Sequence, residues 1–213
     1  MKMLKKNNRK IIYWFPDPAQ TFTSEMAMKA FYSDVAFFDK KNSLEKALLV
    51  NKNSKYVCEG YDESADVVQN VKKQYDISFI GNVYGNRSSV LDRLESVNII
   101  SSAYGLQHSI EVGKTEINLN ICTDSCASDR IYKVLAAGGF LLTDDWYGRE
   151  LTGLVDGEDL VIYKDVEDLQ EKIEFYLSRS YTRDKIASRG LSGQRILQIV
   201  LLCRKNLLYY SIK

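Results

Sequence analysis

The chain has 213 residues, with 29 lysines and arginines against 28 aspartates and glutamates and a formal net charge of +1. A chain of this length and ordinary globular composition has room for one large domain or two small ones. The balanced charge provides no overall field that attracts nucleic acid, so we expect no nucleic-acid partner and only local phosphate binding.

Residues 1–72 predict a partial N-terminal β/α lobe. Apolar, strand-like runs at 10–15, 34–38 and 55–58 alternate with helical patterns at 24–32 and 43–50. Strands that alternate with helices indicate parallel β/α units, and Ser24 and Ser43 are the expected helix caps. A complete Rossmann-like domain contains two such halves, so this lobe is short by about half.

Residues 73–213 restart the pattern and predict a larger Rossmann-like domain. The expected elements are a strand in the ISFIG run, a helix at 88–95, strands at 97–100 and 117–121, and an amphipathic helix at 165–176. Between them, 128–163 predicts a helix, a stop at Gly138-Gly139, a buried strand and an acidic loop. Ser128 or Asp129 is the expected cap of that helix. Ligands of open α/β sheets bind beyond the carboxyl ends of the strands, so we expect this segment to locate the site.

The tail at 194–213 is apolar on too many sides for a simple surface helix. Three alternatives remain open: a buried helix packed on the N-terminal lobe, a peripheral membrane face, and a partner interface or disturbed terminus. No apolar run approaches the roughly 18 residues that span a bilayer, and the IIYWF run is too short for a signal-peptide core. We therefore expect a cytoplasmic protein, with the inner membrane face as the alternative.

The four cysteines lie in or beside apolar runs, at Cys58, Cys122, Cys126 and Cys203. The Cys122-x3-Cys126 pair lacks a second pair of cysteines or histidines that would complete a metal site. We therefore expect reduced, buried thiols and no bound metal.

Two segments carry a family resemblance. The stretch from Arg130 through KVLAAGGFLLTDDW, with Gly148 and Glu150 ahead of DGEDLVIY, resembles the C-terminal domain of GT-B glycosyltransferases, most closely the spore-maturation (CgeB-like) branch. The sequence YDISFIGNVYGNRSSVLDRL at 75–94 is similar to the strand, glycine loop and helix that open the same domain. The resemblance implies a GT-B-like α/β fold. It also implies transfer of a sugar from a nucleotide-diphosphate donor to a hydroxyl of a glycan or cell-surface acceptor.

The loop GNVYGNR at 81–87 is the first expected contact for the donor diphosphate. Backbone N–H groups and the helix dipole favour an anion between a strand and a helix start. Gly81 and Gly85, with Asn82 between them, allow the backbone to approach phosphates closely, and Arg87 adds a charge-assisted contact. An ordinary βα turn is the alternative.

Arg130 stands at a helix start, where its positive charge is unfavourable beside the positive end of the helix dipole. An arginine that lowers stability at this position indicates a functional role. The resemblance places it in the donor pocket, and a surface ion pair with Asp129 or Asp124 is the alternative. Lys133 stands where many related enzymes carry a glutamate that accepts hydrogen bonds from the ribose, and lysine cannot accept. Either the ribose is held otherwise, Lys133 binds phosphate, or donor binding is weakened.

The resemblance also implies donor contacts at the Gly138-Gly139 turn and at Glu150, where retaining GT-B enzymes often carry a carboxylate. A solvated loop charge is the alternative for Glu150. The side chains of the adjacent Asp144 and Asp145 diverge, so we expect them to be structural. The family generally neutralises the leaving diphosphate with protein cations and helix dipoles, so the resemblance implies no cofactor and no metal.

Asp17 in WFPDP ends the first strand on the crevice side, so it is the expected catalytic base, with a turn aspartate as the alternative. His108, the one histidine of the sequence, is expected on the surface or in a loop, with contact to the substrate as the alternative. The two functions that remain are a glycosyltransferase and a non-catalytic nucleotide-sugar-binding or assembly module of the same fold. Lys133 and the short lobe favour the second. A dehydrogenase-like domain would need a G-x-G-x-x-G turn, and a response-regulator domain would need acidic partners around a phosphorylatable aspartate. The sequence contains neither feature, so we set this class of α/β domain aside.

Overall fold

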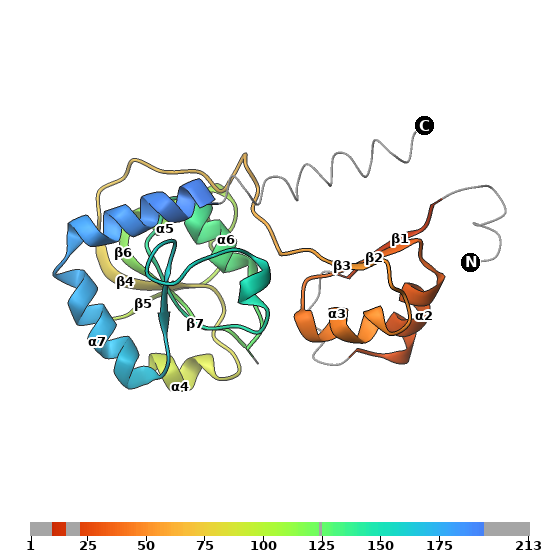
Figure 1. The fold of residues 1–213 in the computed structure, drawn as a ribbon. Coiled ribbons are helices and arrows are strands. Elements are labelled where there is room, and N and C mark those ends of the chain that lie inside the picture. The colour runs from red at the N-terminus through yellow and green to blue at the C-terminus, as the bar shows by residue number, and fades with distance from the viewer. Residues whose placement is uncertain (1–9, 16–21, 124, 194–213) are drawn as a thin grey trace. The chain divides into compact units, whose positions relative to one another are not determined.

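A computed structural model describes residues 10–15, 22–123 and 125–193 of the chain (Figure 1). They form two compact units, the first ending at Glu59 and the second beginning at Gly60. Asp17, Asp124, Cys203 and the tail at 194–213 lie outside the described residues, so what the sequence predicts for them stays a prediction.

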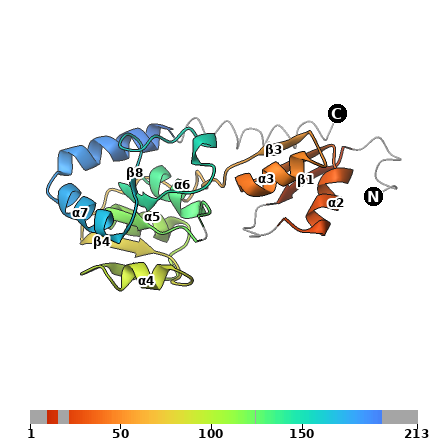
Figure 2. The same cartoon turned by 60° about the horizontal axis from the view of Figure 1, so that its bottom comes forward.

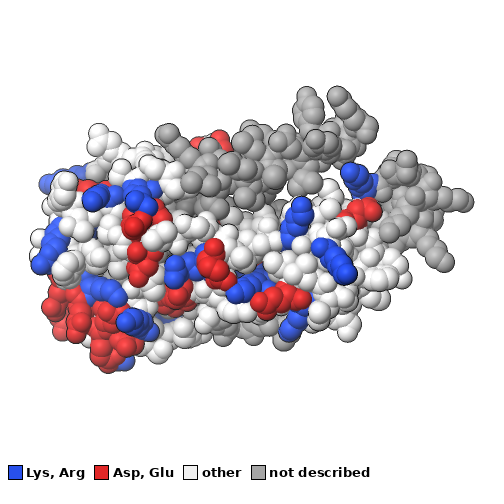
Figure 3. All heavy atoms as spheres, in the orientation of Figure 1, with Lys and Arg blue, Asp and Glu red and all other residues white. Residues whose placement is uncertain are grey.

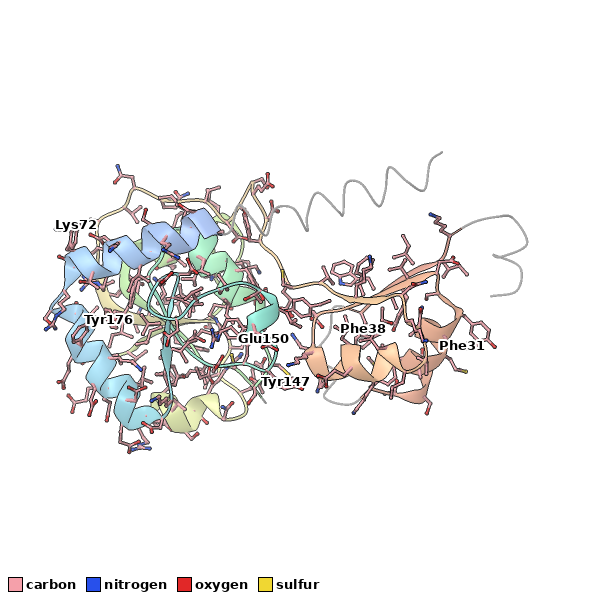
Figure 4. All side chains as sticks on the ribbon, in the orientation of Figure 1. Phe31, Phe38, Lys72, Tyr147, Glu150 and Tyr176 are labelled. Carbon is pink, nitrogen blue, oxygen red and sulfur yellow. The ribbon has the colours of Figure 1, made fainter. Side chains whose placement is uncertain are left out.

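The first unit contains a three-stranded parallel sheet in the order β1-β2-β3. Its elements are β1 (Ile12–Phe15), α2 (Ser24–Tyr32), β2 (Val35–Phe38), α3 (Lys41–Leu48) and β3 (Ser54–Tyr56). The helices and the sheet share a small apolar core that contains Met26, Ala30 and Phe38. Figure 4 shows Phe38 on the sheet, whereas Phe31 projects outward from α2. The β/α pattern of this lobe is therefore as predicted from the apolar runs.

Two predicted helix caps are displaced by a few residues. Thr23 rather than Ser24 caps α2, because its Oγ1 accepts a hydrogen bond from the Met26 backbone N–H at 3.2 Å. Helix α3 begins at Lys41, so Ser43 lies inside its first turn. Sequence patterns locate helix ends only to within a few residues, which accounts for both shifts.

The second unit contains a five-stranded parallel sheet with helices on both faces (Figure 2). Its elements are β4 (Tyr75–Ile80), α4 (Arg87–Leu91), β5 (Asn98–Ile100), α5 (Leu106–Lys114), β6 (Thr115–Asn120), α6 (Asp129–Ala136), β7 (Leu141–Asp144), η1 (Arg149–Leu151), β8 (Val161–Tyr163) and α7 (Val166–Leu177). A further helical stretch covers 180–193. Continuous apolar strands such as β7 are typical of a parallel sheet that is covered on both faces.

Strand β6 has one apolar face and one polar face. Ile117 and Leu119 point into the main core, to which α4, α7 and the 180–193 stretch contribute. Asn118 and Asn120 alternate with them and bond on the other side, where the Asn118 amide donates to the Val112 carbonyl in α5 at 3.5 Å. The polar face of β6 therefore lies under α5 and α6, which contact β6.

The strand order β5-β4-β6-β7-β8 reverses at β4. The chain moves from β4 to β5 on one side and then crosses to β6 on the other side of β4. In doubly wound sheets the loops at such a reversal diverge and leave a crevice at the carboxyl ends of the strands. The loops that follow β4 and β6 stand at this point.

The second unit begins before the predicted boundary at residue 72. The Ser109 hydroxyl in α5 donates to the Ala65 carbonyl at 2.9 Å and accepts from the Val67 backbone N–H at 3.3 Å. The Gln74 backbone N–H donates to the Lys114 carbonyl at 2.7 Å. These bonds attach residues 60–74 to α5, which the sequence pattern does not reveal.

Basic and acidic side chains mingle over the described residues on the face drawn in Figure 3. Acidic side chains gather at the end of the second unit where α4 and α7 lie. Helix α7 carries Glu167 and Asp168 in its first turn.

Candidate functional site

A pocket of about 210 Å³ lies at the reversal point of the second sheet. Its wall combines Gly81, Asn82 and Arg87 from the segment after β4 with residues of two helices. His108 comes from α5, and Asp129, Arg130 and Lys133 come from α6. The structure thus brings together five of the predicted donor-binding residues. Pockets for drug-sized ligands measure roughly 300–1,000 Å³, so this pocket has room for a part of such a ligand.

Arg130 lies at the centre of this wall and is buried, with 8% of its surface exposed. Its Nε donates to the Ile80 carbonyl at 2.6 Å, and its Nη1 donates to Asn120 Oδ1 at 2.8 Å. The guanidinium also stacks over the Phe79 ring at 4.4 Å. The alternative of a surface ion pair with Asp129 is wrong, because Asp129 pairs with Lys133 instead.

Asn120 orients the Arg130 guanidinium. Its Oδ1 accepts from Arg130 and, at 3.0 Å, from the Ser128 hydroxyl. Its Nδ2 donates to Thr143 Oγ1 at 2.8 Å, so the amide spans from β6 to β7. Ser128 is the N-cap residue of α6, but its hydroxyl is used for this bond rather than for capping. A network of satisfied polar groups therefore holds Arg130 in one position.

Arg87 is the second buried guanidinium, with 3% exposed. Its Nε donates to the Ile121 carbonyl at 3.1 Å and its Nη1 to the Asn82 carbonyl at 2.9 Å, which joins the loops after β6 and β4. Burial, and then the neighbouring charge of Arg87, lower the pKa of Arg130 to about 10. No carboxylate of the described residues forms an ion pair with either arginine. Buried charges without a counter-ion are costly, so this wall is suited to an anion.

Gly81 is required by the position of Arg130. Its φ is +149°, and a Cβ there would overlap the Arg130 guanidinium. The sequence predicts close approach of this backbone to a phosphate, and the neighbour that the structure shows is the arginine side chain. Glycine at this position therefore makes room for the buried cation.

His108 belongs to the pocket wall and lies in α5, so the expectation of a surface or loop residue is wrong. The residue is buried, and its Nδ1 has no hydrogen-bond partner among the described residues. Burial lowers its pKa to about 4, and the charges of Lys133 and Arg130 act in the same direction. The imidazole is therefore neutral at neutral pH. The apolar period of 106–114 was the available signal, but an internal glycine and several polar residues obscured it.

The buried imidazole is expected to lower folding stability in mild acid. An unfolded histidine has a pKa of about 6.5, so the unfolded chain takes up its proton before the folded one, and stability falls as the pH falls towards 4. Between pH 6 and pH 5, His108 contributes a loss of about 1 kcal/mol. Urea denaturation of the wild type and His108→Gln at both pH values measures this difference. An identical pH response in the two proteins would contradict it.

Four predicted donor-binding residues do not line the pocket. Gly85 follows in the same loop with φ +61°, and Gly138 ends α6 with φ +72°, at the opposite end of the helix from Arg130. A Cβ on Gly139 would meet the side chains of Val112, Asn118 and Val134, so this glycine serves packing. Glu150 is exposed in η1 (Figure 4). Their contacts with a donor stay predictions.

The paired aspartates bind backbone groups near the ends of the loops. Asp144 Oδ1 accepts from the Cys122 backbone N–H at 2.8 Å, and Asp145 Oδ1 accepts from the Trp146 N–H at 2.9 Å. Cys58, Cys122 and Cys126 are free thiols, and Cys126 is only half-buried. Within the described residues no group of three or more His, Cys, Asp and Glu side chains is arranged to hold a metal ion.

A second titratable cluster lies in the first unit and was not predicted. Lys40 Nζ is 3.1 Å from Glu59 Oε1 and 3.3 Å from Asp39 Oδ2, and Asp39 and Lys40 are both buried. Burial raises the pKa of Glu59 to about 7, although Lys40 opposes this shift. Asp39 and Lys40 follow β2 directly, so the cluster stands at the carboxyl edge of the first sheet.

Comparison with protein families identifies the chain. A family described as glycosyl transferase-like matches residues 63–199, which is more than half of the sequence. The chain belongs to this glycosyl transferase-like family. No curated protein matches this glycosyl transferase-like chain at a significant level.

Solved structures establish the fold of this glycosyl transferase-like chain. Anabaena HepE in complex with UDP has a TM-score of 0.73 and 9% identity, and the match covers 98% of this chain and 74% of HepE. The HepE complex with UDP-glucose scores 0.71, also with 9% identity, and covers the same shares. A glycosyltransferase from Rickettsia africae scores 0.66 with 12% identity over 98% of this chain and 78% of that protein. The predicted GT-B-like α/β fold with parallel sheets is confirmed.

Membrane association through a spanning helix is not seen in the part of the glycosyl transferase-like chain that the structure describes. None of its helices there is both long and apolar enough to cross a bilayer. The tail at 194–213 lies outside these residues.

Proposed function

We propose that the chain binds a nucleotide-diphosphate sugar at the pocket beyond β4 and β6 and transfers the sugar to a hydroxyl of a glycan or cell-surface acceptor. The observation that carries this proposal is the pair of buried guanidinium groups of Arg87 and Arg130, which no carboxylate of the described residues neutralises. Membership of the family supports the reaction class. HepE has been solved in complex with UDP and with UDP-glucose, which supports the ligand class.

In the proposed reaction, the bond between the anomeric carbon and the diphosphate oxygen breaks while a bond to the acceptor oxygen forms. The diphosphate leaves with the bonding electrons, and the acceptor proton passes to a base. Fixed cations stabilise the charge that develops on the leaving group, and Arg130 and Arg87 are the cations of this wall that no carboxylate of the described residues pairs. Neutralisation by protein cations without a metal, and Asp17 as the base, remain our proposals.

The finer assignments rest on the sequence resemblance. We propose membership of the spore-maturation branch, a role in polysaccharide biosynthesis, and a cytoplasmic location with the inner membrane face as the alternative. The division into an acceptor-side lobe and a donor-side domain is likewise a proposal. The tail at 194–213 keeps its three alternatives, namely a buried helix, a membrane face or a partner interface.

Calorimetric titration with UDP, GDP and TDP tests the donor site. We expect saturable binding of at least one of them, weakened when the diphosphate is replaced by a monophosphate, because the buried arginines act on the phosphates. Repeating the titration with EDTA and with Mg²⁺ separates neutralisation by cations of the protein from neutralisation by a metal. Absence of saturable binding to all three nucleotides would remove the proposal.

A non-catalytic nucleotide-sugar-binding or assembly module is the second candidate. The observation in its favour is Lys133, whose ammonium donates to Asp129 at 2.5 Å and cannot accept a hydrogen bond from a ribose hydroxyl. Turnover separates the candidates. Release of UDP from UDP-glucose, alone or with glycan acceptors, supports the enzyme, whereas nucleotide binding without release supports the module.

A further inference from the structure

The wall of the pocket contains one carboxylate among the described residues, that of Asp129. It stands on the first turn of α6, and 56% of its side chain is exposed, so a ligand in the pocket can reach it. Lys133 lies one turn later and donates to Asp129 Oδ2 at 2.5 Å. This i, i+4 pair restrains the carboxylate beside the pocket.

The ribose of a nucleotide offers hydroxyl groups that must donate hydrogen bonds. Arginine and lysine side chains have no acceptor, so the cations of this wall cannot receive these hydrogen bonds. An ionised carboxylate has about four acceptor positions, and the Lys133 ammonium occupies one at Oδ2. In Rossmann-like domains a carboxylate commonly binds ribose hydroxyls. The side chain of Asp129 meets this requirement within the described wall.

The surroundings keep Asp129 ionised. Burial acts to raise its pKa, but the hydrogen bond and charge of Lys133 outweigh burial, and the pKa is lowered. The buried His108 lines the same wall, and its Nδ1 has no partner among the described residues.

We propose that Asp129 binds the ribose hydroxyls of the donor and that Lys133 is a positioning residue that holds this carboxylate. The inference rests on the proposed nucleotide-binding function and names the part of the donor that the site recognises. It accounts for the lysine at position 133, because the accepting carboxylate stands one helical turn earlier. The pocket then prefers ribonucleotides to 2′-deoxyribonucleotides.

Calorimetric titration with UDP and 2′-deoxy-UDP tests this proposal, or with GDP and its deoxy form if the nucleotide panel selects guanine. A hydrogen bond to a charged group corresponds to a preference of about tenfold or more for the ribonucleotide. Asp129→Ala is expected to reduce UDP affinity to the level of 2′-deoxy-UDP while leaving 2′-deoxy-UDP binding nearly unchanged. Lys133→Met is expected to reduce the preference partly, and Lys133→Arg to retain it.

The matched control is Asp168→Ala in α7. Asp168 also lies in the first turn of a helix and pairs at i, i+4 with Lys172 at 2.6 Å, but it does not line the pocket. Its loss should lower the melting temperature as Asp129→Ala does and leave nucleotide affinity unchanged.

Three outcomes would overturn the proposal. The first is equal affinity of the wild type for UDP and 2′-deoxy-UDP, and the second is an equal loss of affinity for both nucleotides in Asp129→Ala. The third is a loss of affinity in Lys133→Met that grows with the number of phosphates in the nucleotide. The third outcome would show that Lys133 binds phosphate directly. Failure of every nucleotide to bind is distinct from these, because it removes the proposed function itself.

Discussion

Replacing Arg130 with alanine is expected to weaken binding of a nucleoside diphosphate by about 10- to 100-fold. The guanidinium is buried in the pocket wall without a carboxylate partner among the described residues, so a bound phosphate becomes its counter-ion. Calorimetry with the diphosphate selected by the panel measures the loss. Arg130→Lys is expected to be intermediate, because it retains the charge and loses the planar fork.

Arg183→Ala is the matched control for this prediction. Arg183 is also buried and donates to the Leu177 carbonyl at 2.9 Å, but its charge is neutralised by Glu116 at 2.6 Å. Its removal should cost stability and leave nucleotide affinity unchanged. An Arg130→Ala protein that stays folded and binds the nucleotide as the wild type does would assign Arg130 to structure alone.

Replacing Gly81 with alanine is expected to destabilise the protein by roughly 2–5 kcal/mol and to weaken nucleotide binding as well. The new Cβ meets the Arg130 guanidinium, and φ +149° is a conformation that alanine resists. Because Arg130 must move, its bonds to Ile80 and Asn120 are broken. Urea denaturation gives the first quantity and calorimetry the second.

A double variant separates backbone strain from steric overlap at Gly81. Gly81→Ala, Arg130→Ala removes the overlap and leaves the strain at φ +149°, so Gly81→Ala should then cost about 1–3 kcal/mol. Gly153→Ala is the control for a left-handed residue with open space, because a Cβ at φ +74° there meets nothing within 4 Å, and we expect a cost of about 1 kcal/mol. If the cost of Gly81→Ala were the same with and without Arg130, the overlap would not be its cause.

The fold followed from local patterns because each strand of a doubly covered parallel sheet is a continuous apolar run. VAFF at β2 and LLT at β7 are recognisable in isolation, and Gly138 ends α6 in the left-handed conformation as predicted. Helix α5 was missed because its polar residues and internal glycine weaken the apolar period. Boundaries that depend on bonds between distant segments, such as those of residues 60–74, have no local signal.

The site was predicted in outline, because the residues after β4 and at the start of α6 stand at strand ends. Their partners were not, since Arg130 bonds to Ile80, which lies fifty residues earlier in the chain and becomes its neighbour only through the crossover. The loop glycine at position 81 was correctly singled out, but the group it accommodates is a side chain. His108 joined the wall for the same reason, through the packing of α5 beside α6.

Asn120 decides whether the Arg130 charge is available to a ligand. Its side-chain oxygen orients the guanidinium, but the amide carries no formal charge, so it satisfies the geometry of the cation and leaves the charge itself uncompensated. A carboxylate at the same place would make the same hydrogen bond and close an internal ion pair. The side chain of Asn120 differs from that of an aspartate only by its Nδ2 group, which donates to Thr143. This amide nitrogen therefore leaves the Arg130 charge free to bind an anion, whereas a carboxylate would neutralise it within the protein.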